Sequence, residues 1–289
     1  MDRSVAEVMR GVVDRLSPKY GTGEAKAMGR IIFENMKGWS AVDLAIKANE
    51  PMTDFMAAKI DGVVDRLLND EPIQYIFGVA DFYGMKLKVT ADTLIPRPET
   101  AELVDIIVKE NQRKDLRVLD LGTGSGCIAI ALARNLPFAD VTAVDISGKA
   151  LDVARENASA LHSRVSFVQG DILKLADDGV RSGEGNFDVI VSNPPYIADS
   201  ERSGMEKNVL EHEPASALFV PDDNPLEFYD AILKFAVLFL ADGGRVYFEI
   251  NPRYVREMVS LCRTYGFDDV DEMRDSYGKL RFLRAMRPG

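Results

Sequence analysis

Beyond residue 117 the chain alternates short apolar segments with helical patterns, and this alternation constrains the fold more than any other feature. The apolar segments are rich in β-branched residues and apolar enough to be buried on both faces, and they occupy residues 117–121, 141–146, 165–169, 187–192 and 245–250. Helical patterns lie between them, at about 127–135, 149–161, 225–240 and 254–265. Such alternation is typical of a parallel sheet with helices on both faces.

Two further strand candidates end the chain, at 268–273 and 280–286. A Gly/Ser turn joins them without a helix, so we expect this last pair to be antiparallel. Residues 93–289 are therefore predicted to form a seven-stranded, doubly wound α/β domain. Within it, the segment 182–185 is expected to be a loop.

The first 71 residues carry a helical pattern only. Apolar residues recur there at the spacing of one buried helix face, first over 5–16 and again over 28–36 and 56–68. Ser40 and Thr53 stand where the N-caps of the third and fourth helices are expected. Residues 1–71 are therefore predicted to form a small helical bundle, for which substrate docking and mere packing are both open.

Residues 72–92 change to strand-like alternation. The two alternating segments are 73–77 and 85–89, and Gly78 and Gly84 lie between them. We expect a β-hairpin that links the bundle to the α/β domain. After it, the rigid segment 95–100 places Pro98 where it suits the first turn of a helix that runs to about Lys109.

The composition excludes several classes of function. Asp and Glu number 46 against 35 Lys and Arg, and the net charge of −11 has the wrong sign for stable nucleic-acid binding. The two cysteines lie far from both histidines, His162 and His212, so we expect no disulfide framework and no metal site, and the histidines are assigned to solvated or helix-end positions. The longest apolar stretch, 231–240, is too short to span a bilayer. We expect a cytoplasmic protein without a membrane segment.

A glycine-rich loop follows the first strand of the α/β domain. It comprises Gly122, Thr123, Gly124, Ser125 and Gly126. A helix begins directly after it, so a ligand can lie against bare backbone at a helix N-terminus. The second strand ends near Asp145, whose carboxylate can accept both hydroxyls of an adenosyl ribose. Asp171 and Ile172 follow the third strand, where a polar and an apolar side chain can enclose an adenine.

Spacing and charge distinguish the adenosyl cofactors. The glycines occupy positions one, three and five of the loop, whereas the dinucleotide fingerprint has them at one, three and six. Asp120, directly before the loop, would repel a pyrophosphate but suits a ligand with an ammonium and a sulfonium group. S-adenosylmethionine, which yields S-adenosylhomocysteine, therefore fits better than NAD.

The sequence Asn193-Pro194-Pro195-Tyr196 directly follows the fourth strand. In an open α/β sheet this position lies beside the glycine loop, at the carboxyl ends of the strands. The Asn193 side-chain oxygen and the Pro194 carbonyl can accept both hydrogens of a planar –NH₂ group, on which Tyr196 can stack. Holding both hydrogens draws the nitrogen lone pair out of conjugation and aims it at a methyl group, so no general base is required. Asn193, Pro194 and Tyr196 are the predicted catalytic residues.

Together these motifs resemble the peptide chain release factor N5-glutamine methyltransferase family. The resemblance covers nearly the whole chain and includes the segments 96–100, 122–126, 193–196 and 213–218. It implies a Rossmann-like methyltransferase domain in which Gly122–Gly126, Asp145, Ile172 and Asn193 bind S-adenosylmethionine and residues 193–196 hold the glutamine. It further implies that the target is the Gly-Gly-Gln loop of bacterial class I release factors, and thus a role in translation termination.

Some details and two rival functions stay open. The chain departs from the family pattern at Ala101, at 221–226 and at Asn251. Arg97 and Glu99 either contact the methionine end of the cofactor or cap the following helix. An adenine-N6 or guanine-N2 methyltransferase acting on nucleic acid would use the same Asn193 chemistry, and the net charge argues against it. A non-enzymatic adaptor that binds the cofactor would not need the segment 193–196.

Overall fold

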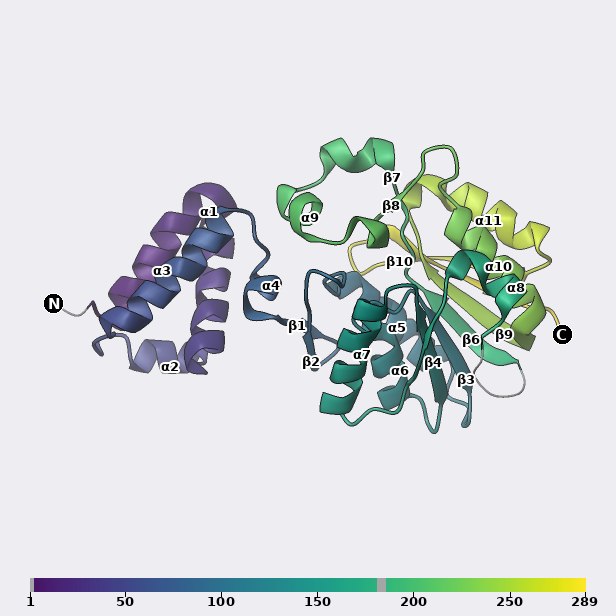
Figure 1. Cartoon of the computed structure of the whole chain (residues 1–289), viewed down its shortest axis with the longest axis horizontal. Helices are drawn as coiled ribbons and strands as arrows, with labels where there is room; N and C mark the ends of the chain where they lie inside the picture. Colours follow the sequence, from purple (N-terminus) through teal and green to yellow (C-terminus); the bar gives the residue numbers. More distant parts are fainter. Residues whose placement is uncertain (1–2, 181–185) are drawn as a thin grey trace. The chain divides into compact units, whose positions relative to one another are not determined.

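The computed structural model describes residues 3–180 and 186–289, so the loop expected at 182–185 lies outside the described part (Figure 1). The chain divides into two compact units. One comprises Met1–Gly78 together with Glu206–His212, and the other comprises Val79–Met205 together with Glu213–Gly289. Each unit has its own hydrophobic core and is described by itself.

The first unit is helical. Its helices are α1 (Val5–Lys37), α2 (Ala41–Ile46), α3 (Asp54–Leu68), α4 (Ile73–Phe77) and α9 (Lys207–His212). The backbone of Gly21 is non-helical, with φ 79° and ψ 154°, and divides α1 into two helical segments. The hydroxyls of Ser40 and Thr53 accept hydrogen bonds from backbone N–H groups of α2 and α3, so both predicted N-caps are confirmed. Large apolar side chains such as Leu16, Phe33 and Ile60 fill the core.

The hairpin has a different first strand from the one predicted. Residues Ile73–Phe77 form the short helix α4, and the hairpin instead pairs β1 (Val79–Phe82) with β2 (Met85–Lys88). The prediction was wrong because alternation over five residues does not distinguish a strand from one helical turn. Gly78, with φ 68°, ends that turn in the left-handed conformation.

The second unit is built on a seven-stranded sheet, as predicted, and its strand order is β10-β11-β9-β6-β3-β4-β5. Its strands are β3 (Arg117–Leu121), β4 (Asp140–Asp145), β5 (Ser166–Gln169), β6 (Phe187–Ser192), β9 (Leu240–Glu249), β10 (Asp268–Arg274) and β11 (Leu280–Met286). β11 is antiparallel to both of its neighbours, and the other pairs are parallel. β5 was expected to be buried on both faces, but it is an edge strand whose two end residues are exposed.

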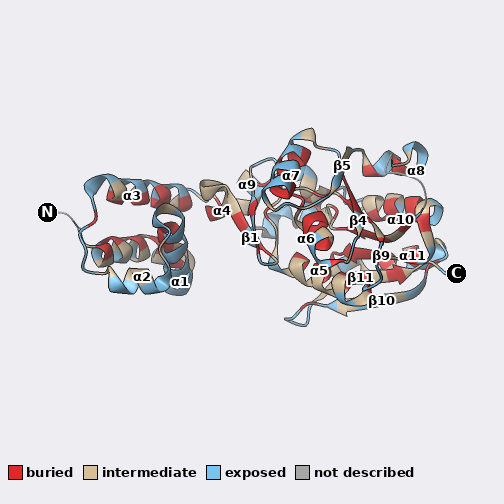
Figure 2. Ribbon diagram, turned by 90° about the horizontal axis from the view of Figure 1, so that it is seen from below, coloured by how far each residue is buried: buried red, intermediate tan, exposed pale blue. Residues whose placement is uncertain are grey.

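Helices cover both faces of this sheet (Figure 2). Alternate strand residues face opposite sides of the sheet. Val118 and Val191 pack on one side, in the core that contains α5 (Pro98–Glu110) and α6 (Cys127–Asn135). Leu119 packs on the other side, in the core that contains α10 (Glu227–Phe239) and α11 (Val255–Thr264). Pro98 is in the first turn of α5, as expected. The remaining elements are α7 (Gly148–Ala160), α8 (Leu175–Asp178), a parallel pair β7 (Ile197–Ala198) and β8 (Phe219–Val220), and short 3₁₀ turns at Ile172–Lys174, Asp199–Gly204, Ala215–Ala217 and Pro252–Tyr254.

The cysteines and histidines lie where the sequence indicated. Cys127 and Cys262 are free, His162 is exposed just beyond the end of α7, and His212 ends α9. Across residues 3–180 and 186–289, no helix combines the length and the apolar character that crossing a membrane requires.

Candidate active site

A cleft of about 390 Å³ lies in the second unit, at the carboxyl ends of the central parallel strands. This is a usual volume for a small-molecule site. The predicted site residues that line it are Gly122, Gly124, Asp145, Asp171, Ile172, Asn193 and Pro195. The predicted residues beside the lining are Thr123, Ser125, Gly126, Pro194 and Tyr196. The topology thus brings together motifs that lie up to about 70 residues apart in the chain.

The glycine loop depends on backbone conformations that favour glycine. Gly122, Gly124 and Gly126 have φ values of 76°, 55° and 82°. At Gly126 a Cβ would also lie 3.0 Å from Ile130 Cδ1 and 3.1 Å from Ala154 Cβ, so that these neighbours would have to shift by a few tenths of an ångström. These three glycines let the loop pass tightly from β3 into α6, and Gly122 and Gly124 present bare backbone to the cleft.

Asp145, the last residue of β4, is oriented by backbone N–H groups. Its Oδ2 accepts a hydrogen bond from Gly124 N at 2.8 Å, and its Oδ1 accepts one from Ser147 N at 2.9 Å. Burial raises the pKa of this carboxyl, while the backbone donors oppose the rise. Each oxygen keeps a further lone pair, so the carboxylate can accept the two hydroxyls of a ribose.

Asp120 lies beneath the loop and does not line the cleft. Its Oδ2 accepts from Thr123 Oγ1 at 2.7 Å and from Ala129 N at 3.2 Å, whereas its Oδ1 is buried and has no hydrogen-bond partner among the described residues. Burial raises the pKa of Asp120 to about 7. Asp120 therefore does not line the cleft, and any charge that it carries reaches the cleft only across the loop.

Asp171 and Ile172 lie at the next strand end, and both line the cleft. Asp171 Oδ1 accepts from Leu173 N at 3.0 Å and so begins a 3₁₀ turn. Ile172 is buried, and its Cδ1 would lie 3.7 Å from a Cβ on Gly122. One wall of the cleft is therefore apolar and lies against the glycine loop.

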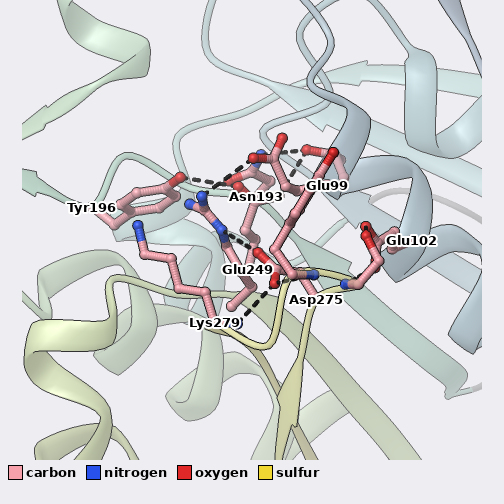
Figure 3. A network of polar contacts seen from close by, with 11 residues as sticks. Glu99, Glu102, Asn193, Tyr196, Glu249, Asp275 and Lys279 are labelled. Carbon is pink, nitrogen blue, oxygen red and sulfur yellow. Dashed lines mark hydrogen bonds and ion pairs between the residues drawn. The ribbon is translucent and has the colours of Figure 1, made fainter.

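Asn193 lies at the front of a buried polar network (Figure 3). Asn193 Nδ2 donates to Thr100 Oγ1 at 3.2 Å, and Thr100 Oγ1 donates to Glu249 Oε2 at 2.7 Å. The Tyr196 hydroxyl donates to Glu249 Oε1 at 2.9 Å. Burial raises the pKa of Tyr196 well above its ordinary value. The Tyr196 hydroxyl is therefore protonated and its proton is donated to Glu249.

Sequence reasoning missed Thr100 and Glu249 as members of the site. The signal that could have found Glu249 is a single carboxylate at the end of β9, a strand that is apolar over the preceding residues. Arg281 of β11 lies beyond it and pairs with Glu99 at 3.2 Å and with Asp275 at 3.1 Å. The ion pairs of Arg281 with Glu99 and Asp275 thus form a charged network next to the residues of the cleft.

Arg97 and Glu99 both form ion pairs within the second unit. Arg97 pairs with Glu213 Oε1 at 2.6 Å, and Glu213 Oε2 also accepts from Ile95 N at 3.2 Å. Neither Arg97 nor Glu99 lines the cleft, and no side-chain capping hydrogen bond forms at the start of α5. Arg97 thus ties the segment before α5 to Glu213, and Glu99, in the first turn of α5, ties that helix to Arg281 of β11.

A doubly wound sheet with this glycine loop, a strand-end aspartate and an asparagine after the fourth strand defines a methyltransferase. A family model described as "Methyltransferase domain" matches residues 112–261, and one described as "PrmC N-terminal domain" matches residues 7–78. The solved structure of a methyltransferase from Pyrococcus furiosus is similar, with a TM-score of 0.52 and 21% sequence identity. The similarity covers 78% of this chain and 98% of that one, and it supports the fold alone.

Curated relatives identify the family. The release factor glutamine methyltransferase of Bacteroides thetaiotaomicron is 42% identical over 99% of this chain and 100% of its own length. That of Flavobacterium psychrophilum is 40% identical over 94% of this chain and 95% of its own length. The chain belongs to the release factor glutamine methyltransferase family, and the resemblance inferred from its motifs is confirmed.

Proposed function

We propose that the protein transfers a methyl group from S-adenosylmethionine to the side-chain amide nitrogen of the glutamine in the Gly-Gly-Gln loop of class I peptide chain release factors. The observation that carries this proposal is the 42% identity to a release factor glutamine methyltransferase over 99% of the chain, which spans both units. The position of Asn193 at the cleft agrees with chemistry on a planar amide.

The residues of the cleft fit S-adenosylmethionine. Asp145 would hold the ribose hydroxyls, Ile172 and Asp171 would enclose the adenine, and the Gly122–Gly126 loop would lie along the rest of the molecule. The unpartnered buried oxygen of Asp120 favours a ligand with positive charge. When bound, the cofactor supplies an electrophilic methyl group on a sulfonium.

Asn193 and Pro194 would activate the glutamine. The Asn193 side-chain oxygen and the Pro194 carbonyl would accept the two amide hydrogens, which localises the lone pair on the nitrogen. The methylated nitrogen then loses a proton readily, so no general base is needed. Pro195 and Tyr196 would enclose the flat side chain, with the Tyr196 hydroxyl anchored on Glu249.

We further propose that the helical unit docks the release factor. The residues proposed to bind cofactor and glutamine all belong to the second unit, and a Gly-Gly-Gln loop offers few side chains for recognition. A stable protein–protein contact buries about 1,600 Å² in total, more than a cleft around one glutamine provides. Recognition of a folded substrate therefore needs further surface.

The helical unit offers a suitable groove between α1 and α2. Its volume is about 530 Å³, and side chains such as Met9, Val13 and Leu44 make its floor apolar. Arg10, Lys26 and Arg30 line it as well, are exposed, and form no ion pair with any residue in 3–180 or 186–289. In a chain of net charge −11, this local positive charge selects an acidic segment with an apolar face. We assign that segment to the release factor.

One assay tests the proposed reaction. Purified release factor, transfer RNA and duplex DNA are offered in parallel with methyl-labelled S-adenosylmethionine, and the product is mapped by mass spectrometry. We expect label on the glutamine of the Gly-Gly-Gln loop. Label on a nucleic-acid base alone would instead favour the rival nucleic-acid methyltransferase.

A charge reversal tests the docking groove. Arg30→Glu should raise KM for the folded release factor severalfold and leave KM for a short glutamine peptide unchanged, because the residues proposed to hold the glutamine all belong to the second unit. Lys59→Glu is the matched control, since Lys59 is exposed on α3 and does not line the groove. Equal effects of the two reversals would refute the assignment.

A further inference from the structure

Two hydrogen bonds, one buried and one partly buried, connect the sheet to Asn193 (Figure 3). Glu249, at the end of β9, accepts from the Thr100 hydroxyl, and the Thr100 oxygen accepts from Asn193 Nδ2. Thr100 and Glu249 are each 2% exposed, and neither lines the cleft. Both residues therefore act on the cleft only through Asn193 and its neighbours.

The direction of these hydrogen bonds determines which end of the Asn193 amide faces Thr100. An ionised carboxylate can only accept, so Glu249 takes the single proton of the Thr100 hydroxyl. The Thr100 oxygen can then only accept, and the group of Asn193 that faces it must be the NH₂. The Asn193 carbonyl oxygen is left as the end available to a ligand.

The pKa of the Glu249 carboxyl is raised on balance, because burial outweighs the contacts that favour the ionised form. Burial raises the pKa of the Glu249 carboxyl, and Glu99 adds to that rise. The hydroxyl donors Thr100 and Tyr196 and the positive charge of Arg281 lower it. The carboxylate also accepts on both oxygens, as the ionised form requires.

We propose that Thr100 and Glu249 are positioning residues that hold Asn193 with its side-chain oxygen, rather than its NH₂, toward the amide to be methylated. This inference rests on the proposed function, because it concerns the same site. The glutamine amide presents two N–H donors and needs acceptors opposite them. An Asn193 turned the other way would place a donor against a donor.

Removal of the Thr100 hydroxyl tests the proposal. Thr100→Val keeps the shape of the side chain, and Thr100→Ala removes the hydroxyl without placing a methyl group beside Glu249. Both should lower kcat on a Gly-Gly-Gln peptide about tenfold, because Asn193 loses its fixed orientation. The dissociation constant of S-adenosylhomocysteine should stay within about twofold, which also shows that each variant is folded. Thr100→Ser, which keeps the hydroxyl, should restore kcat.

The control is Thr142→Val, at a buried threonine of β4 outside this network, which should keep the wild-type kcat. Wild-type kcat in Thr100→Val and Thr100→Ala would overturn the proposal. So would a loss in Thr100→Ser as large as in Thr100→Val, since the hydroxyl would then not be the cause. Failure of the proposed function is distinct, because the wild-type enzyme itself would then leave the glutamine peptide unmethylated.

Discussion

Asp120→Asn should stabilise the protein at neutral and alkaline pH, although it removes a charge beside the cofactor cleft. In the folded protein the Asp120 carboxyl is fully buried, and its pKa rises from an ordinary 3.8 to about 7 because of desolvation and, to a smaller extent, the charge of Asp145. Between about pH 4 and 7 the folded state thus binds more protons than the unfolded state. Stability falls as pH rises through this window.

The magnitude follows from the same shift. One pKa unit corresponds to about 1.4 kcal/mol, so a rise from 3.8 to about 7 corresponds to about 4 kcal/mol above pH 7. The asparagine keeps one oxygen for Thr123 Oγ1 and Ala129 N, and its NH₂ takes the place of the unpartnered Oδ1. It therefore mimics the protonated acid. The gain in unfolding free energy should be near zero at pH 4 and should grow to about 4 kcal/mol at pH 8.

The assay is urea unfolding without cofactor at several pH values from 4 to 8, followed by far-UV circular dichroism. Tryptophan fluorescence is unsuitable, because the sole tryptophan, Trp39, lies in the helical unit. Asp268→Asn, at an exposed carboxyl of β10, is the control for the removal of a charge. A stability difference between Asp120→Asn and wild type that stays constant across the range would refute the reasoning.

Three further outcomes are expected. S-adenosylhomocysteine should stabilise the protein by about 2.7 kcal/mol at a hundredfold excess over Kd, whereas NAD should not; a melting shift with NAD alone would contradict the cofactor assignment. Asn193→Ala should lower kcat about 10² to 10³-fold with a smaller effect on cofactor affinity, and near-wild-type turnover would show that the site is misassigned. In urea unfolding, Gly126→Ala should lower the free energy of unfolding more than Gly278→Ala. Both glycines have φ near 80°, but only at Gly126 would a Cβ contact Ile130 and Ala154. Equal losses in the two variants would show that the backbone conformation alone, and not the contact with Ile130 and Ala154, causes the loss.

The sequence predicted best the helices and strands that are buried along most of their length. β3, β6 and α6 have the predicted bounds, because each is mostly apolar and has clear turn residues at its ends. The caps at Ser40 and Thr53 were predictable for a local reason, since a cap depends on residues only three apart.

The sequence could not predict what depends on distant partners. Whether 73–77 forms a strand or a helical turn depends on which segment pairs with β2, and the edge position of β5 depends on the order of the whole sheet. The hydrogen bonds of Thr100 to Asn193 and Glu249 span 93 and 149 residues, and no local pattern records them. The glycine loop, in contrast, could be recognised because its chemistry and its backbone requirement lie in five consecutive residues.

Asp120 and Glu249 show how the sheet supports the cleft without lining it. Each carboxylate lies at the carboxyl end of β3 or β9, is buried, and accepts a hydrogen bond from a threonine hydroxyl. Thr123 belongs to the glycine loop, and Thr100 contacts Asn193. Burial raises the pKa of both carboxyls, so each costs folding free energy in its charged form. Each carboxyl orients a threonine hydroxyl that belongs to the glycine loop or contacts Asn193, and we infer that the order which this gives to the cleft is the reason that the cost in stability is retained.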